Sequence, residues 1–169
     1  MSRPMSKPLV LVMGVSGAGK STVGGLLAER LGVRFADADD FHPPANVAKM
    51  SAGTPLMDED RWPWLDAIGA WLSEREAEGG VVTCSALKRV YRDRLRAACP
   101  ALRLLYLHGP AELVMARQAA REGHFMPASL MVSQYATLEP PGPEEGAVAL
   151  TVEAPPEAIV TAAMGALLA

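Results

Sequence analysis

The stretch Gly14-Val-Ser-Gly-Ala-Gly-Lys-Ser21 constrains this chain more than any other. It fits the pattern G-x-x-x-x-G-K-S, in which glycines let the backbone curl until its N–H groups face phosphate oxygens. In that pattern the lysine contacts the β- and γ-phosphates of a nucleotide, and the serine hydroxyl ligates Mg²⁺. An apolar run at 9–13 predicts a buried parallel strand before the loop, and apolar residues recur with helical spacing from Val23 to Leu31. The order of strand, loop and helix therefore predicts a phosphate site at a helix N-terminus.

The residues predicted to bind the nucleotide share this loop and the first turn after it. They are Gly14, Ser16, Gly17, Ala18, Gly19, Lys20, Ser21 and Thr22.

The length and charge of the chain limit its other roles. With 169 residues, half of them hydrophobic, the chain is predicted to form one domain over 1–169. A net charge of −3 argues against nucleic acid or an anionic membrane as the main partner, so an anionic substrate needs a local basic cluster. Cys84 and Cys99 lack metal-ligand spacing and favour a reducing compartment.

Targeting and membrane signals are not expected. No apolar run reaches the ~18 residues of a membrane span. Residues 1–7 lack the apolar core of a signal peptide and are expected to be a disordered start. The sequence therefore predicts a cytoplasmic protein.

The rest of the chain alternates between strand and helix patterns. Short apolar segments at 33–37, 81–84, 102–107 and 148–152 are each followed by a helical pattern. A β-α unit repeated five times predicts an α/β fold, with a five-stranded parallel sheet between two layers of helices. The pair Gly24-Gly25 inside the first helix is expected to reflect close packing of helix on sheet, and Trp64 and Trp71 are expected to pack in the core.

Two acidic residues follow the second predicted strand. Asp37 and Asp39 lie where the carboxyl ends of parallel strands gather ligands. Beside a phosphate loop, one suits magnesium and the other suits a base toward a hydroxyl. The alternative is that Asp39 or Asp40 only caps the next helix or turn.

Two pairs of basic residues also stand out. Lys88 and Arg92 lie one turn apart after the third strand, where they could hold a carboxylate or a polyol. Arg117 and Arg121 lie four apart beside Gly123, which suggests a helical lid over about 117–137 that brings positive charge to the transferring phosphate. The alternative for Arg117 and Arg121 is that they are surface arginines near a turn. Arg94 and Arg96 are predicted to lie on a solvated helix face.

Several short motifs together resemble the gluconokinase (gluconate kinase) family of P-loop small-molecule kinases, from about Leu9 to the C-terminus. Besides the phosphate loop they are Asp37-Ala-Asp39, Phe41-His-Pro43, Asn46, Lys49-Met50, Gly53-Thr-Pro-Leu56, Asp60-Arg61, Trp64-Leu65, Cys84-Ser-Ala-Leu-Lys88, Tyr91-Arg92, Gly123-His-Phe125 and Leu138-Glu-Pro-Pro141. One departure is Ala38, where that family often has Gly.

This resemblance implies ATP-dependent phosphorylation of D-gluconate to 6-phosphogluconate, which feeds the pentose phosphate pathway. It also implies a three-layer kinase fold with a lid, a homodimer, and the cofactors ATP and Mg²⁺. Asp37 would then hold Mg²⁺ through water together with Ser21, and Asp39 would meet the acceptor hydroxyl. The catalytic residues implied are Lys20, Asp39, Arg117 and Arg121. The substrate contacts implied are Asp39, His42, Lys49, Arg61, Lys88, Arg92 and His124.

Two other functions stay open from the sequence. The first is another small-molecule kinase, for shikimate or a nucleoside monophosphate. The second is a GTP-driven switch, but the guanine-reading pattern Asn-Lys-x-Asp is missing from the chain, and Asn46-Val-Ala-Lys49 is a different pattern. A pure binding module would not need the two acids and the lid arginines together.

Overall fold

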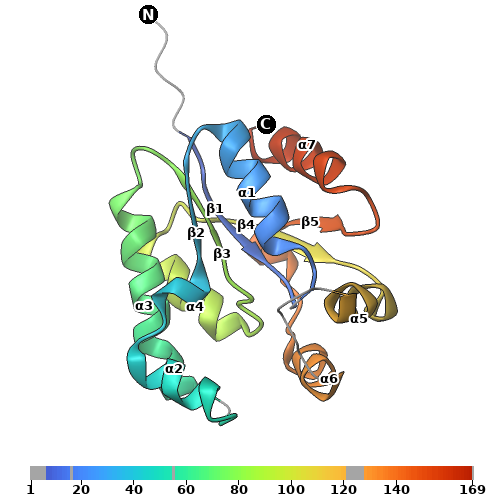
Figure 1. The fold of residues 1–169 in the computed structure, drawn as a ribbon. Coiled ribbons are helices and arrows are strands. Elements are labelled where there is room, and N and C mark those ends of the chain that lie inside the picture. Colours follow the sequence, from blue (N-terminus) through green and yellow to red (C-terminus); the bar gives the residue numbers. More distant parts are fainter. Residues whose placement is uncertain (1–6, 16, 55, 121–127, 169) are drawn as a thin grey trace, which may run out of the picture.

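The computed structural model describes residues 7–15, 17–54, 56–120 and 128–168. Within them, five strands form one parallel sheet in the order β2-β3-β1-β4-β5 (Figure 1). The strands are β1 (Leu9–Met13), β2 (Arg34–Asp37), β3 (Gly80–Thr83), β4 (Arg103–His108) and β5 (Val148–Thr151). Each neighbouring pair is parallel, so the carboxyl ends of all five strands lie at one edge of the sheet.

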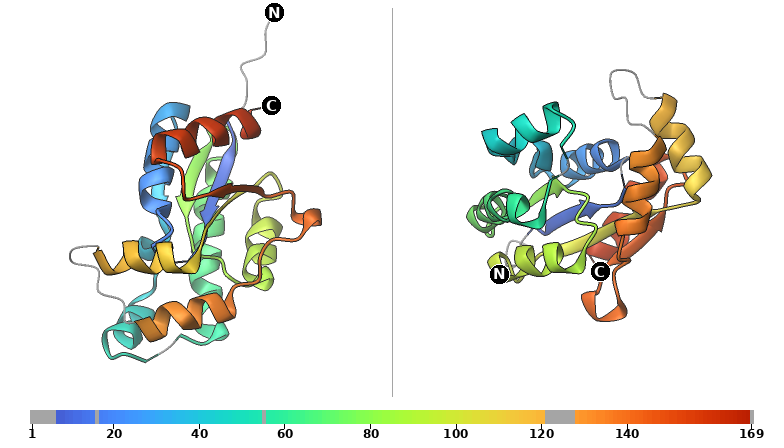
Figure 2. Two further views of the ribbon diagram at one scale, coloured as in Figure 1. Left: turned by 90° about the vertical axis from the view of Figure 1, so that its right-hand side faces the viewer. Right: turned by 90° about the horizontal axis from the view of Figure 1, so that it is seen from below.

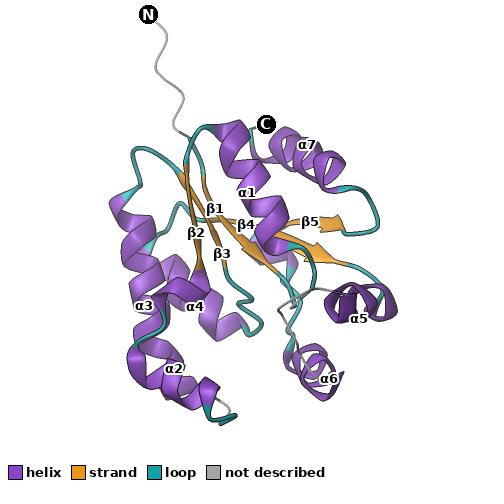
Figure 3. Ribbon diagram, viewed as in Figure 1, coloured by secondary structure: helices purple, strands orange, loops and turns teal. Residues whose placement is uncertain are grey.

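Helices cover both faces of this sheet (Figure 3). They are α1 (Lys20–Leu31), α2 (Pro44–Ser51), α3 (Asp58–Glu74), α4 (Arg89–Ala98), α5 (Ala111–Ala120), α6 (Ala128–Thr137) and α7 (Pro156–Leu167), with 3₁₀ turns η1 (Ala38–Phe41) and η2 (Pro143–Glu145).

Strand β1 shows how the core divides into two halves. Val10 and Val12 belong to a buried cluster with residues of α1 and α7. Leu9, Leu11 and Met13 point the other way, into a second cluster with residues of α3 and α4. A strand that is apolar on both faces must be covered on both faces. The predicted three-layer α/β/α fold is thereby confirmed.

The edge of the sheet at the carboxyl ends of its strands is visible in two views. In Figure 1, β1, β2 and β3 run downward while β4 and β5 run toward the right, and α2 and α6 lie at the bottom of the view. The left view of Figure 2 shows α5 and α6 gathered at that same end of the molecule. The functional residues predicted from the sequence follow these strand ends, so the fold brings most of them to one region.

Helix α1 packs tightly on the sheet at only one of its two glycines. A Cβ on Gly24 would lie 2.9 Å from the Phe35 ring and 3.0 Å from the Thr83 methyl group. A Cβ on Gly25 would meet no atom within 4 Å. The predicted close packing is therefore confirmed for Gly24 and explains nothing about Gly25.

The predicted element boundaries are correct within one or two residues. Helix α3 begins at Asp58, which puts Pro63 in its second turn. Helix α6 lies within the segment 117–137 that was predicted to form a helical lid, whereas Ser16 and residues 121–127 lie outside the described residues. None of the helices in the described part of the chain combines the length and apolar character that crossing a bilayer requires.

Candidate active site

The phosphate loop is shaped by its backbone. The Lys20 ammonium donates hydrogen bonds to the carbonyls of Gly14 and Val15, both at 3.0 Å, so the lysine folds back across the loop that precedes it. Gly17 has φ +83°, and a Cβ there would lie 2.9 Å from the Cβ of Gln118 on α5. Only glycine fits this position. The loop therefore forms a curled cradle at the N-terminus of α1, where phosphate binds favourably.

The two predicted magnesium ligands lie side by side. The Ser21 hydroxyl donates to Asp37 Oδ2 at 3.1 Å, although the two residues come from α1 and β2. The other Asp37 oxygen accepts the backbone N–H of Asp39 at 3.0 Å, so Asp37 is the residue that caps η1. The capping role considered for Asp39 or Asp40 is thus filled by their neighbour. A hydroxyl and a carboxylate together are the hard oxygen ligands that suit Mg²⁺.

Asp39 belongs to η1 and lies near both Lys20 of the phosphate loop and His42. Partial loss of hydration raises the pKa of its carboxyl, and the nearby Asp37 carboxylate raises it further. His42 and Lys20 act in the opposite direction on that pKa. A carboxylate with a raised pKa accepts a proton more readily than an ordinary aspartate, as a general base must.

The His42 ring is held by two neighbours, Trp64 and Asn46. Its ring stacks on Trp64 with ring centroids 4.4 Å apart and an angle of 9° between the planes. The Trp64 indole N–H donates to the Ala38 carbonyl of η1 at 2.7 Å. Asn46, which is 2% exposed, lies 3.2 Å from His42 Nδ1 through its amide nitrogen. Trp64 therefore does more than fill the core, which was the sequence prediction for it.

The first residues of α3 place acids next to the predicted sugar-acid contacts. Lys49 contacts both oxygens of Asp60 at 2.8 Å. Asp58 accepts from Tyr91 Oη at 2.6 Å and lies 3.3 Å from the Lys88 ammonium and 3.9 Å from Arg61. The region thus holds cations and carboxylates together.

Arg92 does not fit its predicted contact with substrate. Its side chain has no exposed surface and forms a double hydrogen bond to Glu145, at 2.8 and 3.0 Å. It also donates to the carbonyl of Ala86 at 2.8 Å. Ala86 has φ 45°, a strained angle for a residue other than glycine. Arg92 therefore stabilises the turn that carries Lys88 and leaves the contact with an anion to other residues.

The segment after α6 is fastened to the same turn. The Glu139 N–H donates to the Leu87 carbonyl at 2.7 Å, and the Glu139 carboxylate accepts the Arg89 N–H at 3.0 Å. Arg96, predicted to be on a solvated face, reaches Glu145 at 2.8 Å and is half-buried. Arg94 is exposed and pairs with Asp66, as a solvated helix face allows.

The predicted lid residues are only partly described. Arg117 donates to the Val152 carbonyl at 2.6 Å, just beyond β5. In this structure it is directed toward the β5 end of the sheet. Arg121 and His124 lie outside the described residues, so their predicted roles, like that of Arg117 over the phosphate, stay predictions.

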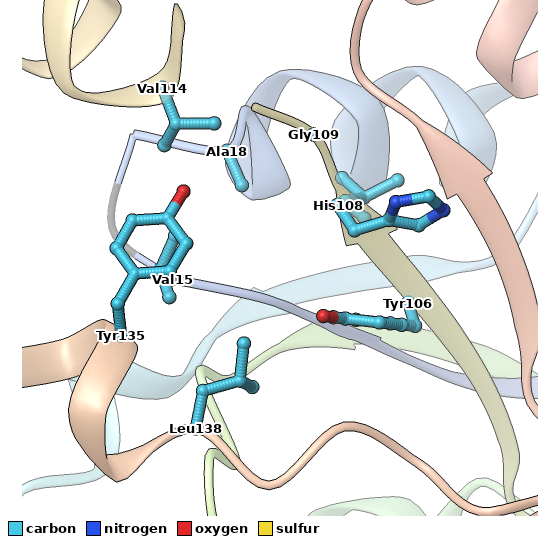
Figure 4. Close-up of a pocket in the computed structure, with 9 residues that line it drawn as sticks. Val15, Ala18, Tyr106, His108, Gly109, Val114, Tyr135 and Leu138 are labelled. Atoms are coloured by element: carbon cyan, nitrogen blue, oxygen red, sulfur yellow. The ribbon is translucent and has the colours of Figure 1, made fainter. Parts of the chain in front are cut away.

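A small pocket adjoins the phosphate loop on the side of α5 and α6. Figure 4 shows Val15 and Ala18 of the loop facing Val114 of α5 and Tyr135 of α6, with Tyr106 of β4 below. Its walls are mainly apolar. The pocket is therefore part of the packing between the loop and the two helices.

Sequence reasoning missed Asp58 and Asp60 as partners of the basic residues and Asn46 as a partner of His42. The two acids could have been found from their position next to Arg61, a predicted substrate contact. Asn46 is one of the residues that carry the family resemblance, but no local pattern indicates its partners, which become neighbours only when α2 packs on α3.

The fold and the site define a P-loop kinase that acts on a small molecule: a phosphate cradle, two acids at the end of β2, and a basic region beyond them. The family model for shikimate kinase matches residues 16–135. A gluconokinase of Gluconobacter oxydans (strain 621H) is 48% identical over 153 residues, covering 89% of this chain and 86% of that protein.

Solved structures agree with these matches. The crystal structure of a gluconokinase from Sinorhizobium meliloti 1021 has a TM-score of 0.88 and 48% identity, with 98% of this chain and 94% of that chain covered. A shikimate kinase from Bacteroides thetaiotaomicron has a TM-score of 0.69 but 16% identity, with 96% and 99% covered, and shows the fold alone. This chain belongs to the gluconokinase family.

Proposed function

We propose that this protein transfers the γ-phosphoryl group of ATP to the 6-hydroxyl of D-gluconate, giving 6-phosphogluconate and ADP. The observation that carries the proposal is the mixed lining of the acceptor region. Lys49, Lys88 and Arg61 can hold the carboxylate of a sugar acid, and Asp58 and Asp60 can accept hydrogen bonds from its hydroxyls. The relatives named gluconokinase support the same substrate.

The residues form a continuous path from nucleotide to acceptor. Asp39 is close enough to Lys20 and to His42 for each to alter its pKa. Burial lowers the pKa of the His42 ring, and the nearby Arg61 cation lowers it further, against the effect of Asp39. Arg61 and Lys88 then both approach the Tyr91 ring, at 5.5 and 5.6 Å. A substrate with a hydroxyl near Asp39 and a carboxylate near Lys88 would lie along this path.

In the mechanism, the hydroxyl oxygen of gluconate forms a bond to the γ-phosphorus in line with the breaking bond to the β,γ-bridging oxygen. ADP leaves with the electron pair of that bond, and Asp39 receives the hydroxyl proton. Lys20 and the loop N–H groups stabilise the negative charge that spreads over the phosphoryl oxygens. Orientation by these residues, together with exclusion of water, supplies most of the acceleration.

Ser21 and Asp37 are the residues that would hold Mg²⁺, directly and through water respectively. Their oxygens lie 3.1 Å apart beside the loop. An ion held by these two residues would supply positive charge against the β- and γ-phosphates. We further propose that Arg117 and Arg121 act as lid arginines and that the protein forms a homodimer. We also propose a cytoplasmic location, without nucleic acid or membrane partners. The two buried free cysteines suit a reducing compartment.

Another small-molecule kinase activity, toward shikimate or a nucleoside monophosphate, is the main rival. The match to the shikimate kinase family model favours it, whereas 48% identity to gluconokinases over most of the chain favours gluconate.

A substrate panel tests the proposal. The purified protein, ATP and Mg²⁺ are combined with D-gluconate, shikimate or AMP, ADP formation is followed, and the product is identified by ³¹P NMR. We expect turnover with gluconate and a phosphomonoester at its 6-position. Preferred turnover of shikimate or AMP would overturn the assignment.

A further inference from the structure

Asn46 occupies a buried position between His42 and the start of α3. It is 2% exposed, which is unusual for an asparagine side chain. Its amide nitrogen donates to the backbone carbonyl of Asp60 at 2.9 Å and lies 3.2 Å from His42 Nδ1. A buried amide that is anchored to the Asp60 carbonyl can fix the state of its other partner, the His42 ring.

The Asp60 carbonyl fixes which way the amide faces. A carbonyl oxygen can only accept a hydrogen bond, so the Asn46 atom near it must be the nitrogen. That nitrogen carries two hydrogens, and the second is directed to His42 Nδ1. The ring nitrogen must then accept, so a neutral His42 carries its proton on Nε2.

Trp64 fixes the plane of the same ring. Its indole stacks on the imidazole, and its N–H is anchored to the Ala38 carbonyl at 2.7 Å. Burial lowers the pKa of the His42 ring. No residue in the described part of the chain forms a hydrogen bond with His42 Nε2, so this N–H is available to a ligand.

We propose that Asn46 is a positioning residue that holds His42 as the Nε2–H tautomer, and that this N–H donates a hydrogen bond to an oxygen of the sugar acid. The ligand part of this inference rests on the proposed function. The charged groups that act on the ring are Asp39 on η1 and Arg61 on α3, while Asp60, whose backbone carbonyl binds Asn46, is paired with Lys49 of α2.

Nitrogen NMR of the wild-type protein without substrate tests the tautomer directly. Long-range ¹H–¹⁵N spectra of ¹⁵N-histidine-labelled protein distinguish a protonated from an unprotonated ring nitrogen, and the His42→Gln variant identifies the signals of His42. We expect a neutral ring at pH 7 with its proton on Nε2. A proton on Nδ1 would overturn the proposal, whatever substrate the enzyme uses.

The Asn46→Asp variant tests the consequence for activity. Its carboxylate can only accept, so a neutral His42 would move its proton to Nδ1 and lose the donor on Nε2. We expect kcat/KM for gluconate to fall on the order of tenfold at pH 8, the loss of one such hydrogen bond. Protonation of the ring at lower pH restores the Nε2 donor, so the ratio of variant to wild type should recover toward pH 6.

The control for that pH profile is the double variant Asn46→Asp/His42→Gln, whose ratio to the wild type should not recover at low pH. A ratio that is flat in the single variant as well would mean that Asn46 is merely structural.

A second pair of variants replaces His42 itself, and so does not depend on the folding of Asn46→Asp. His42→Gln places an amide nitrogen near the position of Nε2, whereas His42→Asn reaches only the position of Nδ1. The glutamine variant should therefore keep roughly tenfold more kcat/KM than the asparagine variant. Equal activity in both would contradict the donor role. If all variants and the wild type fail to use gluconate while the tautomer is Nε2–H, the proposed function fails and the role of Asn46 in setting the tautomer stands.

Discussion

The nucleotide half and the acceptor half of the site are built in different ways. The phosphate loop uses backbone curvature and one lysine, all within residues that are near neighbours in sequence. The acceptor half uses side chains from η1, α2, α3 and α4, and each of its described basic residues is paired with an acid. A phosphate can therefore bind to preformed backbone, whereas a sugar acid must fit between charges that already balance one another.

This difference has a chemical consequence. A cation held by a carboxylate has a fixed position, and the carboxylate keeps lone pairs for hydroxyl groups. Lys49 with Asp60, and Lys88 with Asp58, are such pairs. A molecule with both a carboxylate and several hydroxyls suits this lining better than a neutral alcohol or a nucleotide.

The largest effect is expected from Lys20→Ala, which removes the only side-chain cation of the phosphate loop. Transition-state charge then loses one stabilising contact, and kcat should fall on the order of 10²–10³, or about 3–4 kcal/mol. Steady-state kinetics with gluconate and ATP measures this. Lys7→Ala is the matched control, because Lys7 is exposed and contacts Gly32 near the start of β1, at the end of the strand opposite the phosphate loop. A Lys20→Ala enzyme with wild-type kcat would contradict the role of Lys20 in stabilising the transferring phosphate.

Glu145→Gln tests the buried anchor of the acceptor half. Arg92 and Glu145 are 0% and 1% exposed, so the substitution leaves an uncompensated buried charge. We expect unfolding free energy to fall by about 3 kcal/mol, measured by urea denaturation. Glu144→Gln is the control, since Glu144 is 54% exposed and its pairing with Arg89 should contribute less than about 1 kcal/mol. Equal losses of unfolding free energy in the two variants would show that the buried pair contributes no more to stability than the exposed pair.

The same pair predicts a pH dependence of stability. Hydrogen bonds from Arg92 and Arg96 lower the pKa of Glu145 to about 2, against the effect of burial. As the pH falls below about 4.5, the unfolded chain binds this proton before the folded chain does. Stability should thus be lost progressively between pH 4.5 and 2, and the loss should be shallower in Glu145→Gln. Parallel profiles would contradict this assignment.

These long-range pairs also show what the sequence could predict. The phosphate loop and the Ser21–Asp37 pairing follow from local patterns and from the rule that strand ends meet at one edge. The partner of Arg92 is 53 residues away, and Lys49 and Asp60 are 11 apart on different helices. Spacing within α4 put Arg92 beside Lys88, but only tertiary packing decides that one is buried and the other reaches the site.

Lys88→Ala tests the acceptor half itself. Charge-assisted hydrogen bonds contribute about 1.5–3 kcal/mol, and at a partly exposed site we expect the lower end, roughly a tenfold rise in the KM for gluconate. The KM for ATP should stay unchanged. Arg94→Ala, on the exposed face of α4, is the control, because Arg94 pairs with exposed Asp66. A rise in the KM for ATP alone would show that Lys88 belongs to the nucleotide half of the site and would contradict its assignment to the acceptor half.

The smallest effect concerns the helix that carries the loop. Gly25→Ala has open space and should stabilise the fold by up to about 1 kcal/mol through helix propensity. Gly24→Ala should destabilise it, because the new methyl group would press on Phe35 and Thr83. Thermal unfolding of both variants measures the difference, and a stabilised Gly24→Ala variant would contradict the packing described for α1.

The central claim is that the paired charges of the acceptor half select a polyhydroxy carboxylate. Its most direct test is the ratio of kcat/KM for D-gluconate to that for D-sorbitol, which has a similar chain of hydroxyls but no carboxylate. We predict a ratio of about 100 or more, and a ratio reduced about tenfold in Lys88→Ala. A ratio near one in the wild type would contradict the account.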